Sequence, residues 1–453
     1  MSLIKKIKSI NSFQIIDEVS GRRYEFNDLP EILWTSESKG LVFCYLDNSF
    51  ESISFLLKAL ESRHVLVLFS ITLSTTFKEA LESNYAPNYI FDANRPEIAT
   101  YTKIGSALYF NMQDRKHDLH ADLKVLLSTS GTTGSPKLVK LSDGNLLSNA
   151  EAIAAYLPIS STDIVPLNLP VHYSYGLSVL TSNAISGATI CSGSLDVMSK
   201  GFWENFQKYQ YTTLAGVPYV YEMLDRIGFT KMDLPSLRYF TQAGGKLRDD
   251  LVKKYGTYAN DKVKLFYVMY GQTEATARMS YLDPSALLTH IGSIGKAING
   301  GMFKVHTETS ELLYEGPNVF GGYAQTLEDL RSFESPGILN TGDLARIDEE
   351  GFIFITGRSK RIAKVFGNRI NLDELESSIS KHFSDYYACV GLQDKTIVIF
   401  STNDNCQPKD IIDWVSKEYK LHPSSLKLMN IQSFPLTGNG KINYSILTQE
   451  YDS

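Results

Sequence analysis

Along this chain, short runs of hydrophobic residues alternate with longer amphipathic stretches, in which hydrophobic and polar positions are mixed. From residue 40 onward, the apolar runs Leu41–Tyr45, Val65–Phe69 and Tyr89–Phe91 are separated by the amphipathic segments Ser52–Leu60 and Phe77–Leu81. Parallel strands joined by covering helices produce this rhythm. The pattern predicts a first sheet-based subdomain of the α/β class.

A second series of the same kind runs from about Ile164 to Met269. Its expected strands are Thr212–Leu214, Leu237–Thr241 and Val263–Val268, each followed or preceded by a helical stretch. No internal repeat and no low-complexity linker interrupts the two series. We therefore expect two sheet-based subdomains joined by short connections.

The pattern changes near residue 358 to a smaller α+β arrangement. The elements expected there are a strand at Phe352–Ile355, a hairpin at Ile362–Ile370, a helix at Leu372–His382, strands at Tyr387–Leu392 and Thr396–Phe400, and a helix at Lys409–Tyr419. We place the domain boundary at Arg358–Lys360, which gives an N-terminal domain of residues 1–358 and a C-terminal domain of residues 359–453.

Composition narrows the class of protein. The 453 residues, with 43% hydrophobic and 21% charged positions, suit an ordinary globular protein of about three folding units. A net charge of −6 without any long Lys/Arg run gives no support to nucleic-acid binding. The four cysteines, widely spaced and without a CxxC pair, are expected to be reduced thiols rather than zinc ligands. No apolar run approaches the ~20 residues needed to span a bilayer, so we expect a cytoplasmic protein.

The segment Leu127-Ser-Thr-Ser-Gly-Thr-Thr-Gly-Ser-Pro-Lys137 follows an apolar strand. Its glycines allow backbone N–H groups to converge on an anion, its hydroxyls add donors, and Lys137 adds a positive charge. The spacing differs from a Walker loop, because Pro136 precedes the lysine and Leu138 follows it. We interpret the segment as a phosphate-binding loop, although in isolation a Ser/Gly-rich surface turn would explain it comparably well.

Further motifs follow in a fixed order along the chain. They are Tyr270-Gly-Gln-Thr-Glu274, Thr341-Gly-Asp343, Gly357-Arg358 with Gly367 and Arg369, and Pro435-Leu-Thr-Gly-Asn-Gly-Lys441. With these motifs the sequence resembles the adenylate-forming superfamily of acyl-CoA synthetases, peptide-synthetase adenylation domains and firefly luciferase, from about residue 40 to residue 445. Singly, each motif has a simpler explanation as a turn residue, a helix cap or a solvated charge.

The resemblance implies a fold and a set of nucleotide contacts. The implied fold has a large N-terminal domain of αβα subdomains with a small β subdomain, and a small mobile α+β C-terminal domain. The loop residues implied to close over the β- and γ-phosphates are Thr129, Ser130, Gly131, Thr132, Thr133, Gly134 and Lys137. The residues implied to contact adenine, the α-phosphate and ribose are Gly244, Gly245, Tyr270, Gly271, Gln272, Thr273, Asp343 and Arg358. Glu274 is implied to bind magnesium, which favours one carboxylate together with substrate phosphates.

The implied reaction has two halves. A carboxylate attacks the α-phosphorus of ATP to give acyl-AMP, and a thiol of coenzyme A or of a carrier-protein phosphopantetheine then takes the acyl group. Lys441 and Glu274 would neutralise charge in the first half. For the second half, the resemblance assigns the hinge to Lys360, a tunnel glycine to Gly367 and a phosphate contact to Arg369. Three positions depart from the family pattern: Leu138, Arg361 and Asn371.

The acid pocket is expected to include residues 171–176, with His172 and Tyr173 in the positions nearest the acid. Amino-acid-activating relatives have an Asp in this stretch, and burying an ammonium without one would be costly. We therefore expect an acid without an α-amine, of the aryl or short acyl kind. His172 is explained equally well as a packed histidine bonded to backbone.

Two questions stay open at this point. The acceptor is either coenzyme A or an acyl or peptidyl carrier protein, and the Pro435–Lys441 ending slightly favours a carrier protein. The main alternative function is a nucleotide-binding homologue that has lost turnover and has a regulatory or scaffold role. The intact Glu274, Asp343 and Lys441 argue against that alternative, and a kinase-like transferase would leave the C-terminal motifs unexplained.

Overall fold

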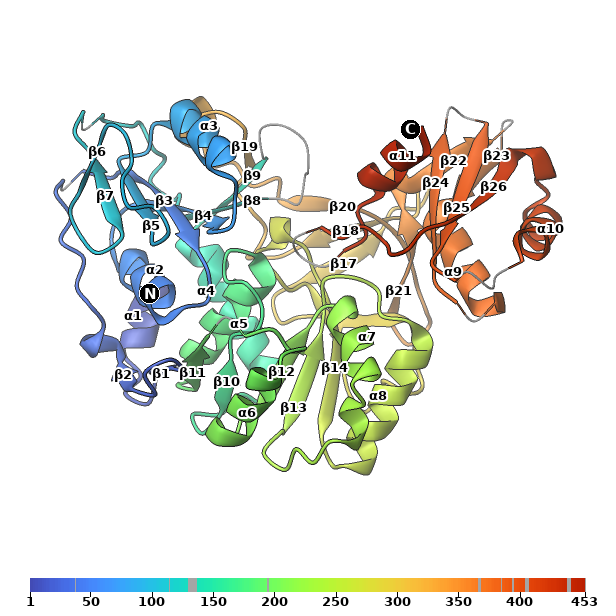
Figure 1. The fold of residues 1–453 in the computed structure, drawn as a ribbon, viewed down its shortest axis with the longest axis horizontal. Coiled ribbons are helices and arrows are strands. Elements are labelled where there is room, and N and C mark those ends of the chain that lie inside the picture. Colours follow the sequence, from blue (N-terminus) through green and yellow to red (C-terminus); the bar gives the residue numbers. More distant parts are fainter. Residues whose placement is uncertain are drawn as a thin grey trace. The chain divides into compact units, whose positions relative to one another are not determined.

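The computed structural model describes residues 1–36, 38–113, 115–128, 137–193, 195–365, 368–383, 385–392, 395–403, 407–437 and 441–452. The chain forms two compact units (Figure 1). The first contains residues 1–302 and 314–339, and the second contains residues 303–313 and 340–453. In the described ranges, no helix combines the length and the apolar character needed to cross a membrane.

The first series of predicted strands forms a sheet with the strand order β19-β9-β8-β4-β3-β5-β7-β6. Its strands are β3 (Leu41–Leu46), β4 (Val65–Ser70), β5 (Tyr89–Asp92), β6 (Tyr101–Lys103), β7 (Leu108–Asn111), β8 (Val125–Ser128), β9 (Leu138–Leu141) and β19 (Tyr323–Ala324). Strands β3, β4, β5 and β8 are parallel where they pair. The continuous apolar runs of β3 and β4 are buried, as expected for parallel strands with both faces covered.

The connecting helices of this sheet are α2 (Phe50–Glu61) and α3 (Thr75–Tyr85), and both begin at a serine cap. The Ser49 hydroxyl accepts from the Ser52 N–H, and the Ser74 hydroxyl accepts from the Phe77 N–H. Such caps satisfy backbone donors that the first helical turn leaves unpaired. The predicted strand–helix rhythm of residues 41–92 is confirmed.

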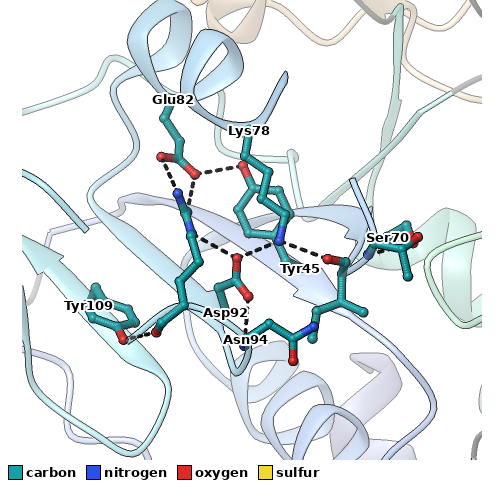
Figure 2. Close-up of polar contacts among 10 residues, drawn as sticks. Tyr45, Ser70, Lys78, Glu82, Asp92, Asn94 and Tyr109 are labelled. Atoms are coloured by element: carbon teal, nitrogen blue, oxygen red, sulfur yellow. Dashed lines mark hydrogen bonds and ion pairs between the residues drawn. The ribbon is translucent and has the colours of Figure 1, made fainter. Parts of the chain in front are cut away.

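Four charged side chains and one tyrosine at the carboxyl ends of β3 and β5 form what we call the paired network (Figure 2): the buried Tyr45, Lys78, Glu82 and Asp92, and the mostly buried Arg95. The Lys78 ammonium lies 2.7 Å from an Asp92 carboxylate oxygen, and the Arg95 guanidinium lies 3.0 Å from the same oxygen. Arg95 also pairs with Glu82 at 2.5 Å, and Glu82 accepts from the Tyr45 hydroxyl at 2.8 Å. Two cations therefore meet two anions inside the unit.

The second series forms the parallel strands β12 (Thr213–Gly216), β13 (Tyr239–Gln242) and β14 (Leu265–Tyr270), followed by the antiparallel β15 (Ser280–Leu282) and β16 (Ser293–Ala297). Helices α7 (Pro218–Arg226) and α8 (Asp249–Asp261) cover one face of β12–β14 (Figure 1). Side chains of α4 (Asp143–Tyr156) and α5 (Ser174–Ala184) share a core cluster with these strands. The second predicted sheet is also confirmed.

A further sheet was not predicted. It has the order β10-β11-β1-β2, with β10 (Ile164–Pro166), β11 (Thr189–Ser192), β1 (Gln14–Asp17) and β2 (Arg23–Glu25). The remaining helices of this unit are α1 (Leu3–Lys8) and α6 (Lys200–Tyr209). Because β1 pairs in parallel with β11 far along the chain, local patterns do not reveal the sheet.

The second unit contains an antiparallel pair, a hairpin and a three-stranded sheet. The pair is β20 (Ile338–Ile347) with β21 (Ile353–Arg358), the hairpin is β22 (Ile362–Val365) with β23 (Asn368–Asn371), and the sheet is β24 (Tyr387–Leu392), β25 (Thr396–Ser401) and β26 (Leu426–Asn430). Its helices are α9 (Leu372–Phe383), α10 (Pro408–Tyr419) and α11 (Tyr444–Asp452). Strands β17 (Met302–Val305) and β18 (Glu311–Glu315) lie where the chain passes between units. The predicted boundary at Arg358–Lys360 falls inside the second unit. The division into domains of residues 1–358 and 359–453 therefore stays a prediction.

Candidate active site

The carboxyl ends of β12, β13 and β14 meet at one edge of their sheet, because these strands are parallel and in register. Two predicted motifs leave this edge: Gly244 and Gly245 after β13, and the Tyr270–Glu274 segment at the end of β14. In open α/β sheets, ligands bind at the carboxyl ends of strands. The structure therefore brings these two motifs to the edge of the sheet where a ligand is expected.

Gly244 and Gly245 lie in tight surroundings. Gly244 has φ +91°, and a Cβ there would lie 3.1 Å from Val217 Cγ1. A Cβ on Gly245 would lie 3.1 Å from Pro218 Cγ, and the Gln242 side chain donates to the Gly245 carbonyl at 2.8 Å. The backbone strand predicted to lie against adenine is thus held close to the start of α7.

Glu274 is positioned by backbone and side-chain contacts. Its carbonyl accepts from the Phe320 N–H at 2.9 Å, and its carboxylate accepts from the Tyr323 hydroxyl at 2.9 Å. In the described part of the chain, Glu274 makes no ion pair. Burial and the neighbouring carboxylate raise the pKa of Tyr323, so its hydroxyl stays protonated and can donate.

Lys137 is brought to the same place by strand pairing. Strand β19 pairs with β9, with Tyr323 opposite Val139, and the Lys137 ammonium lies 3.5 Å from the centre of the Tyr323 ring. Lys137, Tyr323 and Glu274 thus form one group, which we call the site cluster. Tyr323 was not predicted, because no motif marks it and only the β9–β19 pairing places it here.

The predicted phosphate loop begins where β8 ends. Ser128 pairs with Leu138 across the β8–β9 hairpin, so the two ends of the loop are held together. Leu138 is fully buried in β9, which explains an apolar residue after the loop lysine. The predicted residues Thr129, Ser130, Gly131, Thr132, Thr133 and Gly134 lie outside the described residues.

The predicted acid pocket lies at the start of α5. The hydroxyls of Ser174 and Thr273 are 3.3 Å apart, which joins this helix to the Tyr270–Glu274 segment. His172 is 6% exposed, its Nδ1 has no hydrogen-bond partner, and burial lowers its pKa to about 4. His172 is therefore neutral at pH 7. Burial also raises the pKa of the neighbouring Tyr173.

Asp343 and Arg358, in the second unit, are direct partners. They lie opposite each other in the β20–β21 pair, and the Arg358 Nε lies 3.3 Å from an Asp343 carboxylate oxygen. Asp343 is mostly buried with a side chain 14% exposed, whereas that of Arg358 is 52% exposed. The two predicted ribose contacts are thus side by side.

Two departures from the family pattern have structural explanations in the second unit. Arg361 pairs with Asp373 at 2.7 Å and with Glu376 at 2.5 Å, and its guanidinium lies 3.6 Å from the Tyr444 ring centre. Asn371 accepts from the N–H groups of Asp373 and Glu374 at the start of α9. Arg361 therefore anchors the segment after Lys360 to α9 and α11, and Asn371 caps α9.

Lys441 belongs to a short hairpin. Leu436 and Ile442 form an antiparallel bridge, and the Thr437 N–H donates to the Lys441 carbonyl at 2.7 Å. Lys360 is exposed in a short 3-10 turn just before β22. Gly367 and the side chain of Arg369 lie outside the described part of the chain.

The comparisons with known proteins agree with this architecture. The profile of the AMP-binding enzyme family matches residues 36–324. The 2-succinylbenzoate–CoA ligase of Staphylococcus epidermidis is 26% identical over 344 residues, which cover 72% of this chain and 71% of the relative. The medium-chain fatty-acid–CoA ligase of Escherichia coli is 29% identical over 361 residues, 73% of this chain and 62% of the relative.

Among solved structures, o-succinylbenzoate CoA synthetase of Bacillus subtilis, in complex with the acyl-adenylate intermediate, superposes with a TM-score of 0.76 at 18% identity. The superposition covers 98% of this chain and 97% of that one. At this identity the likeness establishes the fold, while the family profile covers more than half of the sequence. The chain belongs to the AMP-binding enzyme family.

Proposed function

We propose that this protein uses ATP and magnesium to convert a carboxylic acid into an acyl-AMP, and then transfers the acyl group to the thiol of coenzyme A. The observation that carries the proposal is the site cluster, where the Lys137 ammonium lies over the Tyr323 ring and the Tyr323 hydroxyl donates to Glu274. The curated relatives activate different kinds of acid, so their names support the reaction class but leave the acid open.

The site cluster suits a magnesium-bound triphosphate. Glu274 offers one carboxylate without an ion pair among the described residues, and Tyr323 orients it. Magnesium prefers one or two carboxylates plus substrate phosphates, and when bound it would neutralise phosphate oxygens. The Lys137 ammonium, which lies over the Tyr323 ring, adds a positive charge to the site cluster. These residues fit the metal and the nucleotide that the family implies.

The chemistry in the first half needs no general base, because the acid is already ionised. A carboxylate oxygen of the acid forms a bond to the α-phosphorus, the bond from that phosphorus to the bridging oxygen breaks, and pyrophosphate leaves. Lys441 would offset charge between the carboxylate and the phosphate, and Asp343 would accept hydrogen bonds from ribose. In the second half, the thiol sulfur bonds to the acyl carbon, AMP leaves with the bonding electrons, and the thiol proton is released.

Pyrophosphate exchange into ATP tests the reaction class. The panel contains aryl, short-chain and medium-chain acids, and α-amino acids beside their deaminated analogues. We expect exchange with at least one acid and faster exchange with the deaminated member of each pair, because His172 is neutral and no carboxylate is expected for an ammonium. Absence of exchange with every acid, in a protein that binds ATP, would support the non-catalytic alternative.

The acceptor is tested with the acid that the panel identifies. Thioester formation is measured with coenzyme A and with a phosphopantetheine-bearing carrier protein in parallel. We expect coenzyme A to react. Transfer to the carrier protein alone would assign the protein to carrier loading.

Variants of the second unit separate the two half-reactions. Lys441→Ala should lower acyl-AMP formation by roughly 10²–10³, the effect of removing one electrostatic stabiliser, and should leave thioester formation from pre-made acyl-AMP near the wild-type rate. Lys360→Pro should do the reverse, because proline fixes the φ angle at the proposed hinge. Equal losses in both steps for Lys441→Ala would exclude alternating use of the C-terminal domain.

A further inference from the structure

Arg361 has three partners inside the second unit, and together they hold its side chain in one position. Its Nε lies 2.7 Å from Asp373 Oδ1 and its Nη2 lies 2.5 Å from Glu376 Oε1, both on α9. Its guanidinium carbon lies 3.6 Å from the centre of the Tyr444 ring, on α11. The Arg361 side chain is only 12% exposed. A guanidinium that meets two carboxylates and an aromatic face is fixed by geometry as well as by charge.

Glu376 joins the same residues from the other side. Its Oε1 accepts from the Cys389 N–H at 2.6 Å, and its Oε2 accepts from the Tyr444 hydroxyl at 3.0 Å. Tyr444 is therefore held twice, by Arg361 over its ring and by Glu376 at its hydroxyl. We call Arg361, Glu376 and Tyr444 the clamp. Because its charged groups are mostly buried, salt screens them less than it screens surface ion pairs.

One end of the clamp lies next to the proposed hinge. Arg361 directly follows Lys360, and the two residues share the short 3-10 turn that precedes β22. Lys360 is exposed, whereas the Arg361 side chain is mostly buried against α9. The chain therefore passes directly from an exposed residue to a fixed one, so a rotation at Lys360 would carry the clamp with it.

The other end of the clamp lies next to Lys441. Tyr444 begins α11 and follows the hairpin that contains Lys441, in which the Lys441 N–H donates to the Thr437 hydroxyl at 3.2 Å. The Asn443 N–H, immediately before Tyr444, donates to the Pro435 carbonyl at 2.7 Å and closes this hairpin. Fixing the Tyr444 ring therefore fixes the end of the hairpin that leads into α11.

Such a link determines where a catalytic group lies after a domain turns, because displacement by about 1 Å can lower a rate by roughly 100-fold. We propose that Arg361 is a positioning residue for acyl-AMP formation, which sets the position of Lys441 relative to the hinge through Tyr444. This proposal rests on the proposed function, in which Lys441 acts in the first half-reaction. It also explains why Arg361 departs from the family pattern, since an acidic residue there would repel Glu376 and could not form the clamp.

Both half-reactions are measured for Arg361→Met, Tyr444→Leu and the control Arg346→Met. Arg346 is exposed in the same unit, and its guanidinium also lies on an aromatic ring, 4.0 Å from the centre of Phe354. Each clamp variant should lower acyl-AMP formation by roughly 10- to 100-fold and leave thioester formation from pre-made acyl-AMP within about threefold of wild type. The control should keep both rates. Equal losses in both half-reactions, or no loss in the first, would overturn the proposal.

The same substitution in a Lys441→Ala background separates positioning from a general loss of structure. If Arg361 acts through Lys441, Arg361→Met should change acyl-AMP formation by less than about twofold once the lysine is absent, because effects that act through one group are not additive. A full further loss in the double variant would show that Arg361 acts on the fold and not on Lys441. Arg361→Lys should restore part of the rate, since it keeps the charge beside Glu376 but not the planar fork.

Amide hydrogen exchange keeps the test independent of the proposed function. In the full chain of Arg361→Met, the amides of Thr437, Lys441 and Asn443 should exchange faster than in wild type, while those of β24 and β25 stay protected. Unchanged protection of the hairpin would overturn the proposal whether or not any acid supports pyrophosphate exchange. Faster hairpin exchange in a protein that activates no acid would support the link and reject the proposed function. If Arg361→Met unfolds the unit, Tyr444→Leu gives the same comparison, because it leaves both ion pairs of Arg361 in place.

Discussion

Two groups of buried charges in the first unit differ in how they are compensated. In the paired network, Lys78 and Arg95 meet Asp92 and Glu82 at 2.5–3.0 Å, and each charge has an opposite charge beside it (Figure 2). Around α5, by contrast, Arg278 makes no ion pair within the described residues, and neither His172 Nδ1 nor Asn183 Oδ1 has a partner. Buried polar groups without partners reduce stability, so the second group stabilises the fold less than the paired network does.

The contrast separates two uses of charge. A complete set of partners holds β3, β5 and α3 together, whereas the polar groups around α5 are only partly paired. The following predictions test whether loss of a charge affects stability in the first group and activity or specificity in the second.

The largest effect is expected in the paired network. Asp92→Asn removes the anion shared by Lys78 and Arg95, and breaking a buried ion pair costs about 3–5 kcal/mol of unfolding free energy. Chemical denaturation measures the change, with the exposed Asp122→Asn as control, which should stay within about 0.5 kcal/mol. Pyrophosphate exchange by the folded variant should remain near wild type. A loss below 1 kcal/mol would show that the network is not structural.

Glu274→Gln should show the opposite pattern. Its carboxylate has no ion pair to lose in the described part of the chain, so stability should change by less than about 1 kcal/mol. Exchange should fall by roughly 10²–10³, because the variant removes the charge proposed to hold magnesium. Tyr323→Phe, which removes only the hydrogen bond to Glu274, should cost roughly 10-fold. Exchange by Glu274→Gln within about threefold of wild type would exclude Glu274 as the metal ligand.

Sequence patterns could predict much of the fold because its strands and helices are locally encoded. The apolar runs of β3, β4 and β5 and the amphipathic α9 and α10 end within a few residues of their predicted limits. The sheet that contains β1 and β11 could not be predicted, because its pairing joins residues that lie far apart along the chain. Short patterns contain no information about such pairings.

The residues of the candidate site divide in the same way, into those that local motifs predict and those that only the folded chain brings together. The motifs around Lys137 and Glu274 were visible as residue types that phosphate and magnesium require, whereas Tyr323 lies between them only because β19 pairs with β9. Arg278 has no signal in the sequence, since a single arginine after a motif is usually exposed. Its burial against the Tyr175 ring is a property of the folded chain.

The third prediction concerns pH. His172 has a pKa of about 4 in the folded protein, because burial penalises its charged form despite the nearby Asp47. An unfolded histidine titrates near 6.5, so the unfolded chain takes up this proton first as the pH falls. Stability is therefore lost between about pH 6.5 and pH 4, by up to about 3 kcal/mol for this residue.

Denaturation of wild type and His172→Gln across this pH range measures the contribution. The variant should lose less stability on acidification. His64, whose pKa is also lowered to about 4 by burial, is present in both proteins, so its contribution cancels. Parallel pH profiles would mean that the pKa of His172 is the same in the folded and the unfolded chain.

The smallest expected change in stability is that of Arg278→Met. Removing a buried cation that has no anion among the described residues relieves a desolvation cost, and the loss of its contact with the Tyr175 ring, worth about 0.5–2 kcal/mol, opposes that gain. Methionine retains most of the apolar length of arginine, so the two effects should leave the unfolding free energy within about 1 kcal/mol of wild type. Denaturation of Arg278→Met beside Asp92→Asn, in the same buffer, compares the two groups directly. A loss of 3 kcal/mol or more in Arg278→Met would place Arg278 with the structural charges of the paired network, and the two regions would then not differ in how their charges stabilise the fold.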